Sequence, residues 1–263
     1  MSTKSLYKGS DFHTSFYNDY SKFKHGSKTQ ARKFGKEVAD VCFFNENASL
    51  IFYSAPYNNI YTASNAFKDY LMSYLSIQFM DKNIQVKQSK IHREYSYDED
   101  YGLMSKEQRV KAISSDIFKI DKSIIKENDT LVFVDDIKIT GSHEQRIKEL
   151  LKRENINNKV IFIYIAQYTG NDPKIEHRLN HDSVTNLIDI NIIIRDEEFI
   201  FNTRVVKYIL RQNTSDFFTF INYQSQIFKE TLLHLSILND YHKNEKYYEN
   251  IMALRNFLST TIG

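Results

Sequence analysis

Apolar positions in this chain follow two different spacings, and each spacing predicts one kind of element. Short runs rich in apolar residues predict strands at 48–53, 131–134, 160–166 and 187–194, and a more polar strand is predicted at 84–91, with Val86 and Ile91. Apolar residues three or four positions apart predict amphipathic helices at 28–43, 64–79, 105–118 and 142–154. The run at 160–166 is continuously apolar, which is typical of a strand buried on both faces of a parallel sheet.

Strands and helices alternate along most of the chain, which predicts an α/β fold with a mainly parallel, five-stranded, doubly wound sheet. Residues 1–26 carry aromatic side chains at helical spacing and predict a short helical segment that packs on this sheet domain. From about residue 199 onward, apolar residues recur only at helical spacing. We therefore expect an α/β domain at 1–198 and a helical C-terminal extension at 199–263 that packs on the sheet.

Composition narrows the class of protein without identifying a function. The 263 residues are 41% hydrophobic and 26% charged, as in an ordinary globular protein with a sizeable core. The net charge of +2 gives no general attraction to nucleic acid or membranes. The single cysteine, Cys42, cannot form an intramolecular disulfide, which fits a reducing cytoplasm. We expect neither a signal peptide nor a membrane span, because no apolar run approaches about 20 residues.

The most informative segment runs from residue 131 to residue 142. A short apolar strand is followed by Asp135 and Asp136, then by a turn with Thr140 and Gly141, then by a helix that Ser142 and Gln145 are predicted to cap. Ligands of open α/β sheets bind at the carboxyl ends of strands, and a helix N-terminus there suits a phosphate. Two carboxylates suit sugar hydroxyls or Mg²⁺. The segment predicts a sugar-phosphate site; the alternative is an ordinary turn with surface acids.

This segment resembles the phosphoribosyl pyrophosphate (PRPP) motif of type I phosphoribosyltransferases. The resemblance implies that Asp135 and Asp136 hold the ribose hydroxyls, act in catalysis and bind Mg²⁺. It also implies a substrate-binding loop in which Thr140 to His143 cradle the 5-phosphate. That loop comprises Ile137, Lys138, Ile139, Thr140, Gly141, Ser142 and His143. His143 stands where the family usually has threonine, and Lys138 and Ile139 replace smaller residues.

The loop after the first predicted strand, at 54–59, has the position of the family's pyrophosphate loop. The resemblance implies that it binds substrate through Ser54, Ala55, Pro56 and Tyr57. The Ala55–Pro56 bond could be cis at modest cost, because proline lowers the penalty. The alternative is an ordinary turn that contains proline.

The end of the second predicted strand supplies Lys90 and Arg93, which the resemblance implies as a clamp on the diphosphate, with Arg93 catalytic. Residues 94–104 resemble the mobile loop that closes over PRPP and excludes water. The alternative for Arg93 is a surface salt bridge with Glu94, Asp98 or Glu99.

Two other groups of residues could either bind a ligand or simply lie on the solvated surface. His177 and His181 share one helix face, as a metal pair would, but a solvated surface pair explains them equally simply. A cluster of basic residues either forms a solvated face or contacts phosphate, and it consists of Lys24, Lys28, Arg32, Lys33 and Lys36.

The function implied by the resemblance is transfer of a 5-phosphoribosyl group from PRPP, with Mg²⁺, to an unknown acceptor with release of pyrophosphate. Short sequence segments, including Ser54 to Tyr57 and Asp135 to Glu144, also resemble a bacterial branch of this family whose genes are found with tellurite-resistance-type stress genes. One alternative is a non-catalytic PRPP or nucleotide sensor. Another is an interaction module of a stress or defence system, which would use residues 200–263 to bind a partner protein or a second copy of the chain.

Overall fold

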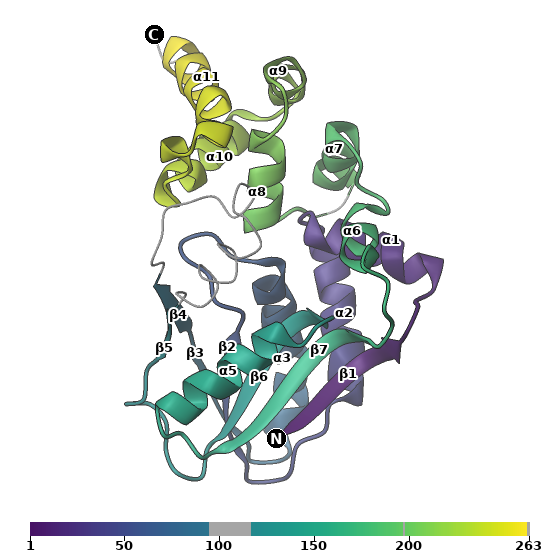
Figure 1. The fold of residues 1–263 in the computed structure, drawn as a ribbon, viewed down its shortest axis with the longest axis vertical. Coiled ribbons are helices and arrows are strands. Elements are labelled where there is room, and N and C mark those ends of the chain that lie inside the picture. Colours follow the sequence, from purple (N-terminus) through teal and green to yellow (C-terminus); the bar gives the residue numbers. More distant parts are fainter. Residues whose placement is uncertain (95–116, 197, 262–263) are drawn as a thin grey trace.

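The five-stranded parallel sheet is the centre of the molecule (Figure 1). A computed structural model describes residues 1–94, 117–196 and 198–261. Neighbouring strands of the sheet all pair in parallel, which confirms the predicted fold class. In spatial order the strands are β1 (Ser2–Gly9), β7 (Lys159–Tyr168), β6 (Thr130–Lys138), β2 (Ser49–Ser54) and β3 (Gln85–Ser89).

Each face of the sheet has its own hydrophobic core, because successive residues of a strand point to opposite faces. Phe52 and Val132 belong to the core on the face covered by the first three helices. Ile51 and Leu131 belong to the core on the face covered by α5. The helices concerned are α1 (Thr14–Lys24), α2 (Lys28–Val41), α3 (Ala63–Met80) and α5 (Ser142–Arg153).

The predicted strand at 84–91 is two strands rather than one. Its first part is β3 of the main sheet, and its last residue begins β4 (Ile91–Glu94). Strand β4 pairs antiparallel with β5 (Ile117–Ile120), so the prediction of helix at 117–118 is wrong. The remainder of the predicted helix at 105–118 lies outside the described residues.

The fifth strand of the sheet is the N-terminal segment, not residues 187–194 as predicted. Those residues form helix α7 (Leu187–Asp196), which buries Ile190 and Ile193 and exposes Ile188 and Ile192. The buried positions are three residues apart, which is the spacing of a helix. The strand was predicted because a composition rich in isoleucine favours strands. Among the described strands, β1 lies at the edge of the sheet and pairs with β7 alone, and its half-exposed residues give a weak apolar signal.

The chain beyond β7 is helical, and its apolar side chains form a third core that includes Val206, Leu232 and Leu254. Figure 1 shows α8 to α11 beyond the carboxyl ends of the strands rather than on either face of the sheet. Among the described residues, no helix is long and apolar enough to cross a membrane. The elements are α6 (Ile175–His181), α7, α8 (Thr203–Leu210), α9 (Thr214–Asn222), α10 (Gln226–Leu238), η1 (Tyr241–Lys243) and α11 (Glu245–Thr261).

Candidate functional site

The two neighbouring carboxylates lie near the carboxyl end of β6, inside the strand rather than after it as predicted. Strand β2 ends at Ser54, opposite Val134, whereas β7 still pairs with β6 as far as Lys138. Asp135 and Asp136 therefore follow the point at which the neighbouring strand stops. An opening beside the end of a strand is where α/β sheets bind ligands.

The turn after β6 presents backbone N–H groups at the start of α5. Gly141 has a φ of +75°, in the left-handed region that disfavours side chains, and it caps the helix. The predicted capping role of Ser142 is therefore wrong, because the Gln145 N–H donates to the Gly141 carbonyl. The hydroxyls of Thr140 and Ser142 lie 3.0 Å apart on the same turn. Such a helix start suits a phosphate group.

Asp135 faces α3 and His143. Its carboxylate accepts hydrogen bonds from the Ser64 hydroxyl at 2.8 Å and from the Asp136 N–H at 2.9 Å, and lies 2.9 Å from His143 Nδ1. Burial opposes ionisation, but His143 and the hydrogen-bond donors prevail and lower the pKa of Asp135 to about 2. The hydrogen bond to Asp135 correspondingly raises the pKa of His143. The pair therefore favours a charged carboxylate beside a protonated imidazole.

Asp136 faces α1, on the opposite side of the strand. Its buried carboxylate forms an ion pair with Lys24 and accepts a hydrogen bond from the Ile137 N–H at 2.9 Å. Burial of Tyr20, together with the nearby charges of Asp136 and Asp135, raises the pKa of its phenol well above the usual range. Tyr20 is therefore a neutral side chain beside the carboxylate.

Lys138, in the spacer of the motif, is occupied by Glu144. Its ammonium lies 2.7 Å from the Glu144 carboxylate, which Lys148 also contacts at 2.5 Å. The Tyr164 hydroxyl donates to the same carboxylate at 3.2 Å. Burial opposes ionisation of Glu144, but the two lysines lower its pKa overall. This network fixes the first turn of α5 against the strands.

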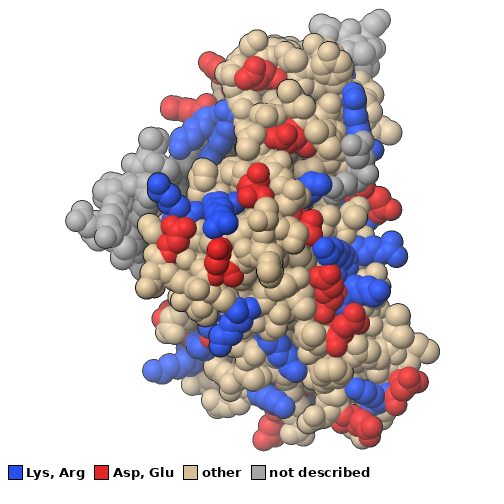
Figure 2. All heavy atoms as spheres, turned by 90° about the vertical axis from the view of Figure 1, so that its right-hand side faces the viewer, with Lys and Arg blue, Asp and Glu red and all other residues tan. Residues whose placement is uncertain are grey.

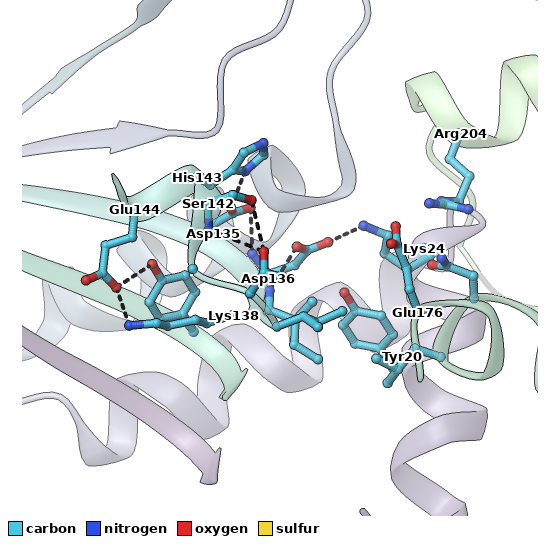
Figure 3. Close-up of a pocket in the computed structure, with 17 residues that line it drawn as sticks. Tyr20, Lys24, Asp135, Asp136, Lys138, Ser142, His143, Glu144, Glu176 and Arg204 are labelled. Carbon is cyan, nitrogen blue, oxygen red and sulfur yellow. Dashed lines mark hydrogen bonds and ion pairs between the residues drawn. The ribbon is translucent and has the colours of Figure 1, made fainter. Parts of the chain in front are cut away.

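A cavity of about 230 Å³ lies between residues 135–144 and the helices α1, α6 and α8. Figure 3 shows Lys24 reaching Asp136 from α1, and Arg204 pointing from α8 toward the same region. Within the part of the chain that the structure describes, Arg204 makes no hydrogen bond or ion pair. The residues on the helical side of the cavity are Tyr20, Lys24, Glu176, Leu179, Asn180 and Arg204.

The segment at 54–59 lies next to the same carboxylates. Ser54, Ala55 and Pro56 line a second, smaller cavity together with Asp135 and His143. The Ala55–Pro56 bond is trans, since the structure describes no cis peptide bond in the residues it covers. This loop therefore lies beside the Asp135 carboxylate, and its role in binding substrate stays a prediction.

Lys90 and Tyr57 lie together at the far end of this loop. The Lys90 ammonium donates to the Asn58 carbonyl at 3.0 Å and lies 4.0 Å from the centre of the Tyr57 ring. Neither residue lines the two cavities described above. Arg93 pairs with Phe118 in the small sheet, but its side chain lies outside the described part of the chain. Of the mobile loop predicted at 94–104, Glu94 is the last residue of β4, and residues 95–104 lie outside the described residues.

Asp135 and Asp136 are the cavity-lining carboxylates that precede the proposed sugar-phosphate turn in the chain, and they are the candidates to hold Mg²⁺. The described residues contain no group of three or more His, Cys, Asp or Glu side chains able to hold a metal. Mg²⁺ is nevertheless commonly held by one or two carboxylates together with substrate phosphates, so the two acids fit that ion. His177 and His181 have rings 4.8 Å apart but lack further ligands among the described residues.

Charges of both signs are mixed on the face that carries α1, α6 and α7. Over the residues of this face that the structure describes, Figure 2 shows Lys and Arg side chains interspersed with Asp and Glu.

Comparison with known proteins identifies the family. The family model for PRTase ComF-like proteins, in which PRTase denotes phosphoribosyltransferase, matches residues 2–254. Because this match spans nearly the whole sequence, the chain belongs to the PRTase ComF-like family. No curated protein matches the chain at a significant level.

Solved structures with a detectable likeness include several hypoxanthine phosphoribosyltransferases. The enzyme from Staphylococcus aureus is 12% identical, with a TM-score of 0.35 over 56% of this chain and 77% of that chain. The Trypanosoma cruzi enzyme in complex with the product IMP is 16% identical, with a TM-score of 0.30 over 56% of this chain and 79% of that chain. These scores are too low to support an inference about substrate.

Proposed function

We propose that the chain binds PRPP together with Mg²⁺ and transfers the 5-phosphoribosyl group to an acceptor, with release of pyrophosphate. One observation carries the proposal. The carboxylates of Asp135 and Asp136, near the carboxyl end of β6, stand before a glycine turn whose backbone N–H groups open α5. Carboxylates suit the ribose hydroxyls, and the helix start suits the 5-phosphate.

The residues of the site would have separate roles. The ribose hydroxyls would lie on Asp135 and Asp136, and the 5-phosphate would lie in the loop from Thr140 to His143. Asp135 raises the pKa of His143, so His143 would add a positive charge when protonated, at a position where the family usually has a threonine hydroxyl. Bound Mg²⁺ would supply charge neutralisation for the diphosphate. Because the bond to ribose C1 breaks with positive charge developing on the sugar, positioning and charge would carry the rate.

The diphosphate would extend toward the loop at 54–59. Ser54 to Pro56 border the cavity next to Asp135, and Lys90 lies at the other end of the loop. Arg93, in strand β4, is proposed to neutralise charge on the leaving group, and residues 94–104 to close over it. Closure would also exclude water from a reactive sugar cation.

We infer a two-part organisation for the chain, with an α/β part at 1–198 and a helical extension at 199–263. The separate hydrophobic core of the C-terminal helices supports this division, although that core also includes residues of α7. The mixed surface charge and single buried cysteine fit a cytoplasmic protein. The segments that resemble the stress-associated branch, including Ser54 to Tyr57 and Asp135 to Glu144, are the ground for proposing a role in a stress response.

A non-catalytic PRPP sensor is the second candidate, and one observation favours it. Both carboxylates already have partners in the structure, Asp135 with His143 and Asp136 with Lys24. A ligand would have to replace these contacts, which couples binding to movement of α1 and α5. Such coupling is what a regulator of another protein requires.

Pyrophosphate release separates the two candidates. The purified chain is incubated with PRPP, Mg²⁺ and a panel of nitrogen heterocycles, and pyrophosphate is measured enzymatically. We expect Mg²⁺-dependent release with at least one acceptor, and none from a variant carrying Asp135→Asn and Asp136→Asn. Saturable PRPP binding without release across the panel would favour the sensor.

A further inference from the structure

The helical side of the cavity differs from the loop side in its charges. On the loop side each charged group that lines the cavity has a partner: His143 with Asp135, and Lys138 with Glu144. Lys24, from α1, is paired with Asp136. Arg204 is the remaining cation of the cavity, and in the described part of the chain it has no ion-pair partner. A half-buried guanidinium facing a cavity without a partner is positioned to bind an anion.

The position of Arg204 follows from the start of α8. The Asn202 side chain caps this helix by accepting a hydrogen bond from the Val205 N–H at 3.0 Å. Asn202 also donates to the Lys24 carbonyl at 3.1 Å, which ties the start of α8 to the end of α1. The hydroxyl of Thr203 donates to the Ile60 carbonyl at 3.0 Å. The first turn of α8 is therefore fixed beside the site, and Arg204 lies within it.

Arg204 lines the cavity together with residues of α1 and α6, whereas Ser54 to Pro56 line the separate, smaller cavity. The loop at 54–59 follows β2, which flanks β6 on one side. The opposite neighbour of β6 is β7, which leads into α6, and α6 packs on α1. In a displacement at ribose C1, the leaving diphosphate and the entering acceptor occupy different sides of the sugar. If the diphosphate lies toward 54–59, the acceptor would enter from α1, α6 and α8.

We propose that the space between α1, α6 and α8 is the acceptor subsite, and that Arg204 selects an acceptor bearing a carboxylate. This inference rests on the proposed function, because it needs the ribose to lie on Asp135 and Asp136. The planar guanidinium offers two parallel N–H donors that match a carboxylate. Tyr20 and Leu179 add an aromatic and an aliphatic surface to the same wall, which suits a ring.

The charge of the wall favours a carboxylate over a phosphate. Glu176, which also lines the cavity, is exposed and has no ion pair among the described residues. One free cation and one acid on the same wall leave little excess positive charge. A monoanion therefore fits better than a dianion, which would need further positive groups.

Matched acceptor pairs test this subsite directly. Nicotinate and nicotinamide differ in the carboxylate, as do orotate and uracil. Each is titrated calorimetrically into the full chain with saturating PRPP and Mg²⁺, and again without PRPP. We expect at least one carboxylate to bind about tenfold or more tightly than its neutral counterpart, because a charge-assisted hydrogen bond contributes that much. Arg204→Gln should remove the preference, and Arg204→Lys should restore part of it.

Arg195→Gln is the matched control, because Arg195 is exposed on α7 and does not line the cavity. This variant should keep the carboxylate preference, and Arg204→Gln should keep the PRPP affinity within about twofold. Thermal unfolding of each variant verifies that it is folded. The inference is overturned if the wild type shows no carboxylate preference, if Arg204→Gln retains it, or if Arg204→Gln loses PRPP binding.

The titrations without PRPP separate this inference from the proposed function. A wild type that does not bind PRPP, yet prefers carboxylates through Arg204, would refute the phosphoribosyl proposal and preserve the anion site. A wild type that binds PRPP but does not discriminate would preserve the function and refute the subsite.

Discussion

The two sides of the cavity are built in different ways. The loop side comes from one continuous segment, residues 135–144, at the junction of β6 and α5. The helical side comes from α1, α6 and α8, which are far apart in the sequence and meet only in the folded chain (Figure 1). The loop side is the part proposed to bind PRPP, and the helical side is the part proposed to select the acceptor. Because the two sides come from different segments of the chain, substitutions in one side can be compared with substitutions in the other.

The strongest test of the loop side removes both carboxylate charges. Asp135→Asn with Asp136→Asn should weaken PRPP binding by about 100-fold or more, because two charge-assisted contacts to the ligand are lost. Calorimetric titration in the presence of Mg²⁺ measures the change.

The matched control for this double variant is Asp40→Asn, which removes a carboxylate on the exposed face of α2. Its PRPP affinity should equal that of the wild type. A folded double variant with unchanged affinity would show that the two acids are not the sugar site.

The second-largest effect is expected for the ion pair of Lys24 with Asp136, which joins the two sides of the cavity. Lys24→Gln leaves the buried Asp136 carboxylate without its cation and should lower the free energy of unfolding by about 1–3 kcal/mol. The coupling energy of the pair is obtained from a double-mutant cycle. Urea unfolding is measured for the wild type, Lys24→Gln, Asp136→Asn and the variant that carries both substitutions. Additive effects of the two substitutions would mean that the contact does not hold α1 against β6.

The turn at Gly141 should show a smaller effect that is confined to the loop side. Gly141→Ala forces a side chain into the left-handed region, at a cost of about 1–2 kcal/mol, and places its Cβ 3.3 Å from Lys138 Cε. We expect weaker PRPP binding and an unchanged carboxylate preference. Gly141→Asn is the control, because asparagine tolerates this conformation better. Equal losses in both variants would point to crowding instead of backbone strain.

The smallest effect concerns pH and the pair of His143 with Asp135. The folded pKa of His143 is raised, so its stabilising contribution is complete below about 6.5 and disappears as the pH rises through the folded pKa. Asp135, with a pKa of about 2, stays ionised throughout that range. Because more than half of the His143 side chain is exposed, solvent screening keeps the effect modest.

The measurement is the unfolding free energy of the wild type and of His143→Gln, without Mg²⁺, from pH 5 to pH 9. The difference between the two proteins should be larger at the acidic end. The charges of Asp136 and Arg146 also act on His143, the first raising and the second lowering its pKa. A difference that grows toward alkaline pH would reverse the assigned direction.

The contrast between the two sides also explains what could be predicted from the sequence. The loop side was predictable because its residues are contiguous, so the spacing of apolar strand, acids and glycine turn is visible directly. The position of the 54–59 loop was predictable because parallel strands bring their carboxyl ends together. Lys24 was visible only as one member of a basic cluster, and the sequence could not show that it alone faces Asp136.

Arg204 and Glu176 gave no sequence signal, because their role depends on how the helices pack. The wrong prediction of the fifth strand, which is β1 and not residues 187–194, has a related cause. Residues 187–194 are rich in isoleucine and appeared to be a strand, but their tertiary contacts bury a helical stripe. Strand β1 is specified mainly by its pairing with β7, which a half-exposed polar sequence does not reveal.

Calorimetric titration of the wild-type chain with PRPP, with and without Mg²⁺, tests the central claim most directly. The account predicts saturable binding to one site, and much weaker binding when Mg²⁺ is removed. A folded wild type that shows no binding under either condition would contradict the claim that this cavity is a PRPP site.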